Sequence, residues 1–266
     1  MNIIVCAKQV IDSEAPAKSF AIDESGLRQA RNGLLLTINP YDQNALEVAL
    51  GFRDRGGAHV TVLSVGTLAA LQTLRHALAM GADRAILVDD PRLLDSDPFG
   101  LAHGLAQAVR TIGSHDLILA GCESSDTGDA VVGPLLAEEL GLSCITYASA
   151  IALQNKGVQV YRNTFDGAER IEASLPIVVT ITSSAANLPR FPKLRDVMRA
   201  AKENVPVWSG SDIGVDPARL GAAQARAVIS DLRIPDRESK CEFISGGSAQ
   251  EQGRRLAQKL RGIGVI

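Results

Sequence analysis

The sequence predicts an α/β fold in which a parallel, doubly wound sheet carries helices on both faces. Short aliphatic runs with the length of buried strands alternate with amphipathic helical patterns through the first two-thirds of the chain. Apolar residues make up 46% of the 266 residues and aromatic residues only 4%, which suits parallel strands covered by helices. An antiparallel hairpin and a C-terminal tether with a helix are expected as additions to this sheet.

The order of the elements follows from where each pattern begins and ends. Residues 9–33 are polar and irregular, and are expected to form a loop or hairpin. The predicted strands share uninterrupted aliphatic runs, at 3–7, 59–65, 84–88, 116–120 and 176–182. The predicted helices share an apolar face: one opens at Asn39-Pro40 with Asp42 in its first turn, and others cover 68–80, 100–111 and a stretch ending near Leu140.

The last part of the chain departs from this alternation of strands and helices. An alternating pattern over 147–174 predicts an antiparallel hairpin at one edge of the sheet, with Asp166-Gly167 in its turn. Two prolines predict an exposed loop over 183–194, and a short helix is expected at 196–202. Scattered Gly, Pro and charge over 203–240 predict an extended tether. Ser248 and Glu251 fit a capping box for a last helix that runs to about Arg261.

Two domains are therefore expected. Residues 1–202 are expected to form an α/β domain that includes the hairpin and the exposed loop. Residues 203–266 form an extended arm, and its helix is expected to pack on another subunit because a tethered helix has few partners in its own domain.

Composition excludes several classes of function. The net charge of −3 argues against non-specific binding to nucleic acid or to an anionic membrane. No apolar run has the length of a membrane span, and the N-terminus does not resemble a signal or transit peptide. The cysteines are too widely spaced for a metal site, so we expect a reducing, cytoplasmic location; they are Cys6, Cys122, Cys144 and Cys241.

Ligands of doubly wound sheets bind beyond the carboxyl ends of the strands. Four segments are expected at those ends: 6–8, 39–42, 64–67 and 121–133. The last is small, polar and glycine-containing, and it leads into a helix on whose apolar side Ala130 and Val131 are expected. Main-chain N–H groups at such a helix start can bind a phosphate. Asp126 or Asp129 is expected to cap the helix or to meet a ribose hydroxyl.

A plainer interpretation of this segment is an ordinary capped helix after a serine-rich loop. Lys8 likewise suits either a phosphate or solvent, and a tight connection explains Gly66-Thr67 as well as a ligand does. The histidines fall outside the carboxyl edge; they are His59, His76, His103 and His115. Ser245–Ser248 is similar to the phosphate loop of ATP pyrophosphatases, but its place near the C-terminus indicates a helix cap.

The sequence carries no dinucleotide fingerprint, phosphate loop or nucleophile elbow of the known forms. No catalytic side chain and no metal ligand is therefore predicted, and any redox chemistry is expected to come from a bound cofactor.

An ordered set of motifs resembles the β subunit of electron-transfer flavoproteins, from residue 3 to about residue 202. The motifs are Val5–Asp12, Asn39–Asp42 followed by Ala45–Ala49, Ala77–Ala85, Asp116–Gly121, Leu175–Thr180, and Pro189–Phe191 with Met198.

The resemblance implies a heterodimer with a larger α subunit that carries a redox-active FAD. It implies that this chain holds AMP or a second FAD. In that site Asn39 and Asp42 contact the adenosine portion, Cys6 and Val65 line the surface beneath it, and the main chain of 121–132 binds the phosphates. The site it implies comprises Cys6, Ala7, Asn39, Pro40, Tyr41, Asp42, Val65, Gly121, Cys122, Glu123, Ser124, Ser125, Asp126, Thr127, Gly128, Asp129, Ala130, Val131 and Val132.

The resemblance also implies that an acyl-CoA dehydrogenase or a related redox partner docks on the loop formed by Ala186, Asn187, Leu188, Pro189 and Arg190. Two departures from the family pattern bear on these expectations. The family commonly has a leucine before the Asn, whereas here Ala186 precedes Asn187 and Leu188 follows it. Thr127 and Val131 do not fit the usual acidic loop, so AMP and a second FAD both stay open, with AMP favoured.

Two alternatives belong to other classes. A stand-alone nucleotide sensor resembling universal stress proteins has the same type of sheet, but it would be shorter and would lack the hairpin, the proline-rich loop and the tethered helix. An adenylating ligase of the pyrophosphatase type would need its phosphate loop after the first strand.

Overall fold

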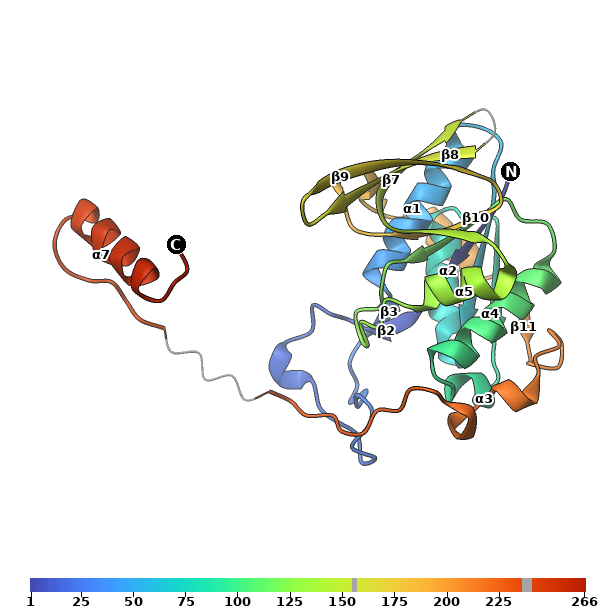
Figure 1. Cartoon of the computed structure of the whole chain (residues 1–266). Coiled ribbons are helices and arrows are strands. Elements are labelled where there is room, and N and C mark those ends of the chain that lie inside the picture. The colour runs from blue at the N-terminus through green and yellow to red at the C-terminus, as the bar shows by residue number, and fades with distance from the viewer. Residues whose placement is uncertain (155–156, 236–240) are drawn as a thin grey trace. The chain divides into compact units, whose positions relative to one another are not determined.

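The computed structural model describes residues 1–154, 157–235 and 241–266 (Figure 1). The chain divides into two compact units, Met1–Asp231 and Leu232–Ile266. Residues 155–156 of the expected hairpin and residues 236–240 of the expected arm lie outside the described residues.

The first unit is built on a mostly parallel sheet, as predicted. Among the described residues this sheet has nine strands, in the order β11-β5-β4-β1-β6-β10-β7-β8-β9. Its parallel strands are β1 (Asn2–Cys6), β4 (His59–Val65), β5 (Arg84–Val88), β6 (Leu117–Gly121), β10 (Ile177–Ile181) and β11 (Val207–Trp208). Apart from the short edge strand β11, these strands are buried on both faces over most of their length, which confirms the parallel, doubly wound class.

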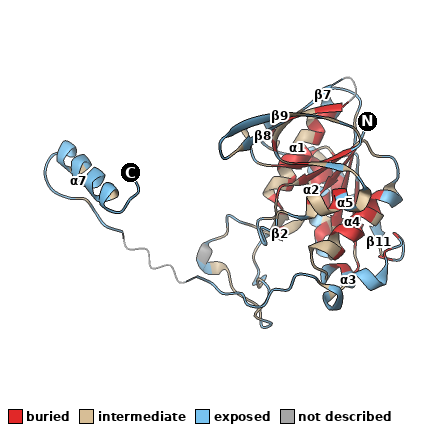
Figure 2. Cartoon of the chain, viewed as in Figure 1, coloured by how far each residue is buried: buried red, intermediate tan, exposed pale blue. Residues whose placement is uncertain are grey.

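Helices cover both faces of the sheet (Figure 2). One face packs against α1 (Pro40–Asp54), α2 (Leu71–Met80) and α6 (Leu194–Ala200). The other packs against α3 (Pro91–Leu94), α4 (Pro98–Ile112) and α5 (Val132–Leu140). Short 3₁₀ turns are η1 (Ala17–Ser19), η2 (Leu68–Ala70), η3 (Ala185–Asn187), η4 (Pro217–Arg219) and η5 (Ala222–Gln224).

The expected hairpin is part of a three-stranded meander. The first strand, β7 (Ser143–Gln154), starts parallel to β10 and then pairs antiparallel with β8 (Gly157–Thr164), which pairs with β9 (Gly167–Ser174). The turn between β8 and β9 lies at 165–166, one residue earlier than expected. The prediction missed the start of β7 because an alternating pattern marks only the half-exposed part of a strand.

Two other segments differ from expectation. Within the irregular region, β2 (Gln9–Ile11) pairs antiparallel with β3 (Leu36–Ile38), a strand that was not predicted. The expected tether, 203–240, begins inside the first unit. Its strand β11 pairs with β5, and four apolar residues near this strand are buried: Val205, Ile213, Val215 and Leu220. These apolar residues are isolated and follow no periodic pattern, so the sequence did not predict their burial.

The second unit contains α7 (Ala249–Gly262), and its predicted capping box is present between Ser248 and Glu251. Every residue of α7 is exposed or half-buried within the described chain, including the apolar Leu256. Of the helices that the structure describes, none has the length and apolar character needed to cross a membrane.

Candidate functional site

The carboxylate of Asp42 joins the carboxyl ends of two neighbouring strands. Its Oδ2 accepts the main-chain N–H of Lys8 at 2.7 Å, and its Oδ1 accepts that of Gly121 at 2.8 Å. Lys8 follows β1 and Gly121 ends β6, and these strands pair in parallel. The first turn of α1 is thereby fastened to the edge of the sheet where ligands of this fold class bind.

This carboxylate is almost fully buried, and its burial has electrostatic consequences. Burial raises the pKa of Asp42 to about 6, although the N–H donors of Lys8 and Gly121 act in the opposite direction. Burial, and secondarily the charge of Asp42, raises the pKa of the Cys6 thiol to about 12. Cys6 is therefore a neutral packing residue at neutral pH, which suits a wall of a binding site and not a nucleophile.

The side chain of Asn39 holds the segment after β6 against the start of α1. Its Nδ2 donates to the carbonyl of Glu123 at 2.8 Å, and its Oδ1 accepts the main-chain N–H of Ser125 at 3.1 Å. Asn39 is 1% exposed and also donates its own N–H to the carbonyl of Lys8. Asn39 and Asp42 were both expected to contact the adenosine portion. In the structure their side chains hydrogen-bond to main-chain groups and so hold the segments of this edge together.

The segment from Cys122 to Val131 forms the loop after β6, and its residues 125–129 are exposed. A Cβ at Gly121 would lie 2.5 Å from Asp42 Oδ1 and 2.7 Å from the Cβ of Tyr41, so only glycine fits. Farther along, the N–H of Gly128 donates to the carbonyl of Ser124. Gly128 and Ala130 both have left-handed backbones, with φ of 64° and 56°. These conformations fold the small, polar residues into a compact turn.

The start of α5 corrects two expectations. The helix begins at Val132, so Ala130 and Val131 lie outside it. Val131 occupies the N-cap position, and in the described chain no side chain caps this helix, neither Asp126 nor Asp129. The left-handed backbone at Ala130 delays the first helical turn. Within the described chain, therefore, no side-chain cap occupies the N–H groups of Val132 and Gly133 at the start of α5, and uncapped groups of this kind can bind a phosphate.

Lys8 contributes a cation to the same edge. Its Nζ contacts Asp126 Oδ1 at 2.7 Å and Ser124 Oγ at 3.3 Å. Burial alone would raise the pKa of Asp126, but the charge and hydrogen bond of Lys8 hold this pKa below its ordinary value. The sequence placed Lys8 at a strand end without predicting this partner, which is 118 residues away.

A tyrosine that the prediction omitted also lies at this edge. Tyr147 has a left-handed backbone, with φ of 57°, and its N–H donates to Thr180 Oγ1 at 3.1 Å. Burial, together with the nearby Cys122 and Glu123, raises the pKa of both Tyr147 and Tyr41. Strained backbones of this kind occur often at functional sites. The sequence offered no signal for it, because bulky residues rarely adopt this conformation.

The segment after β4 completes the edge. Ala7 donates its N–H to the carbonyl of Leu63 at 2.9 Å, so Val65 lies beside the end of β1. A Cβ on Gly66 would lie 2.9 Å from the Cβ of Ala70, which supports the tight connection between strand and helix. The structure thus brings all four predicted segments to one end of the sheet.

The residues of the expected docking loop separate into two groups. Asn187 is buried: its Nδ2 donates to the carbonyl of Thr182 at 2.9 Å, and its own carbonyl accepts from Asn44. Arg190 forms ion pairs with Glu47 and Asp54, each at 2.8 Å. The Arg190 side chain and the main-chain carbonyl of Asn187 therefore hold the loop on α1. The residues left exposed are Ala186, Leu188 and, beyond the loop, Phe191, Leu194 and Met198.

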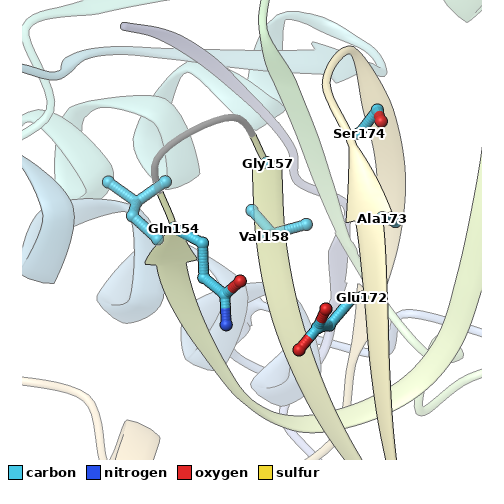
Figure 3. A pocket seen from close by; sticks show the side chains of 7 residues that line it. Gln154, Gly157, Val158, Glu172, Ala173 and Ser174 are labelled. Carbon is cyan, nitrogen blue, oxygen red and sulfur yellow. The ribbon is translucent and has the colours of Figure 1, made fainter.

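An open hollow of about 740 Å³ lies elsewhere, on the meander (Figure 3). It is lined by Leu153, Gln154, Gly157, Val158, Glu172, Ala173 and Ser174. None of these residues belongs to the four carboxyl-edge segments.

Comparison with known proteins shows which protein family the chain matches. The model of the electron transfer flavoprotein domain matches residues 27–213. Protein FixA of Azorhizobium caulinodans is 37% identical over 243 residues, covering 88% of this chain and 85% of that protein. The electron transfer flavoprotein subunit beta of Clostridium acetobutylicum is 36% identical over 221 residues, 83% of each chain. The caffeyl-CoA reductase-Etf complex subunit CarD of Acetobacterium woodii is 33% identical over the full length of both.

Proposed function

This chain belongs to the electron transfer flavoprotein family, and from that premise we propose that it is the β-type subunit of a heterodimeric electron carrier that holds an adenine nucleotide at the carboxyl edge of its sheet. The nucleotide is AMP or a second FAD, with AMP favoured. A larger α subunit carries the redox-active FAD, and the flavin supplies the electron-transfer chemistry when bound. The side chains of this chain position the ligands and catalyse no step of their own.

One observation carries the nucleotide part of the proposal. Asp42 and Asn39 fasten the ends of β1 and β6 and the loop after β6 into a single edge. That edge offers what an anionic adenosine ligand requires: uncapped N–H groups at the start of α5, the Lys8 ammonium, and small residues that let the main chain approach. The carboxylates of Asp126 and Asp129 lie in the same loop, and Lys8 neutralises the first of them.

The exposed apolar residues after β10 support the proposed docking of an electron donor such as an acyl-CoA dehydrogenase or a related enzyme. Leu188 is 71% exposed and Phe191 is 96% exposed, while Asn187 and Arg190 hold the backbone beneath them. Exposed apolar clusters of this kind mark protein interaction sites. Leu188 takes the anchoring role in this proposal.

The second unit is proposed to pack on the α subunit through α7, whose apolar face includes the exposed Leu256. A cytoplasmic location is proposed because each of the four cysteines is free.

The test is to co-express the chain with its α subunit, purify the complex, denature it and identify the released nucleotides by mass and flavin absorbance. One FAD and one AMP per heterodimer are expected. Two FAD molecules would assign the second FAD to this chain. A saturated preparation that releases no adenine nucleotide beyond the FAD of the α subunit would contradict the nucleotide-binding role.

A further inference from the structure

Lys8 and Asp126 form an ion pair inside the proposed nucleotide site. Lys8 extends from the end of β1, and Asp126 lies in the loop between β6 and α5. The two side chains are only partly exposed, at 39% and 24%, so their charges are less screened than those of a fully exposed pair.

A single oxygen of Asp126 receives two donors. Its Oδ1 accepts the Lys8 ammonium at 2.7 Å and the main-chain N–H of Thr127 at 2.8 Å. Ser124 adds a hydroxyl that lies 3.3 Å from Lys8 Nζ. An ammonium, a loop N–H and a hydroxyl are the donors with which proteins bind a phosphate oxygen. The Asp126 carboxylate therefore occupies a donor set suited to an external anion.

We infer that Asp126 is an internal competitor for the phosphate group of the bound nucleotide, and that Lys8 exchanges this carboxylate for the phosphate when the nucleotide binds. The inference rests on the proposed nucleotide site and specifies how its affinity is set. Two anions close to one cation repel each other, so the phosphate and Asp126 cannot both hold Lys8 at full strength.

Substitutions of the two partners should act in opposite directions. Lys8→Gln removes the cation and should weaken AMP binding about tenfold, as expected for the loss of one charged hydrogen bond. Asp126→Asn removes the competitor and should tighten AMP binding several-fold. Adenosine, which lacks the phosphate, should bind both variants within about twofold of the wild-type affinity, because a neutral ligand has no charge for Lys8 to hold.

The experiment measures Kd for AMP and for adenosine by equilibrium dialysis on the full chain after removal of bound nucleotide. The deciding quantity is the ratio of the two Kd values, since a general loosening of the site moves both together. Glu138→Gln is the control: it removes one negative charge from α5, outside the proposed site residues, and leaves the Lys8–Asp126 pair intact. Lys8→Arg should restore most of the preference for AMP.

An unchanged ratio in Lys8→Gln, or an effect of Glu138→Gln equal to that of Asp126→Asn, overturns the inference alone. A wild-type chain that binds no AMP overturns the proposed AMP site and this inference with it. Opposite shifts in Lys8→Gln and Asp126→Asn, with Glu138→Gln near wild type, support the exchange.

Discussion

Gly121 and Asp42 approach each other so closely that a Cβ on Gly121 would stand 2.5 Å from Asp42 Oδ1. The same two residues share a hydrogen bond of 2.8 Å from the Gly121 N–H to that oxygen. The contact holds the start of α1 against the end of β6, and it explains why the residue that opens the loop is a glycine.

Gly121→Ala should therefore lower the free energy of unfolding by about 2 kcal/mol, as overpacking at a close contact does. Urea denaturation followed by circular dichroism measures this change. Gly167→Ala is the control, because the space around Gly167 is open for 4 Å and its backbone carries no strain. Equal stability of the two variants would show that the residues around Gly121 shift to accommodate a Cβ without a loss of stability.

Burial of Asp42 should appear in the pH dependence of stability. Its folded pKa of about 6 lies above the ordinary value of 3.8, so its contribution is fully present below about pH 3.8 and is lost as the pH rises through 6. Asp42→Asn removes this titration. The stability difference between wild type and variant should therefore shift by roughly 2 kcal/mol in favour of the variant between pH 4 and pH 7.

Denaturation of both proteins across that pH range tests this expectation, and subtracting the two curves cancels the other carboxylates. A difference that stays constant with pH would mean that Asp42 has an ordinary pKa in the folded protein.

Leu188 and its neighbour Asn187 should respond in opposite ways to substitution. Leu188→Ser should leave the melting temperature unchanged, because the side chain is 71% exposed, but it should slow electron transfer from the docked donor. Asn187→Ala should cost about 2 kcal/mol of stability, because it removes the donor to the carbonyl of Thr182 and the Oδ1 that accepts the main-chain N–H of Ser184. Thermal melts and donor-dependent flavin reduction measure the two effects. An unchanged rate in Leu188→Ser would remove Leu188 from the docking surface.

Arg219 fastens the segment after β11 to α4 and α5. It pairs with Glu139, next to the buried His103, and it lowers the pKa of Glu139 to about 2. This stabilisation is present above the ordinary pKa of about 4.5 and is lost as the pH falls towards 2. Arg219→Met should destabilise the chain by about 1 kcal/mol at pH 7. The loss is small because the ion pair is partly exposed and solvent screens its charges.

The effect of Arg219→Met should shrink below pH 4, where Glu139 becomes protonated in the unfolded chain. Arg28→Met removes a more exposed pair with Asp95 and should have little effect at either pH. Equal losses of unfolding free energy in the two variants at pH 7 would indicate that the Arg219–Glu139 pair stabilises the fold no more than an exposed ion pair does.

Much of the fold was predictable because its elements are periodic. The predicted 59–65 and 84–88 strands match β4 and β5 residue for residue, and Ser248 opens α7 as expected. The start of α5 was not predictable in the same way. Apolar Ala130 and Val131 continue the helical pattern, but a left-handed backbone at Ala130 places both residues before the helix. Periodicity reports burial, and it carries no information on a single strained φ angle.

Strand and helix patterns in the sequence indicated which segments meet at the candidate site. Parallel strands with right-handed crossovers place their carboxyl ends at one edge, so residues 6–8, 64–67 and 121–133 converge there. Residues 39–42 follow β3, which lies outside this sheet, and they reach the edge through the contacts of Asp42 with Lys8 and Gly121. The contacts of each polar side chain at this site became visible only in the folded chain. Asp42 joins two strand ends, Lys8 meets Asp126, and Asn187 turns inward beside an outward Leu188. Such pairings join residues far apart in the chain, and they depend on packing distances that no local pattern encodes.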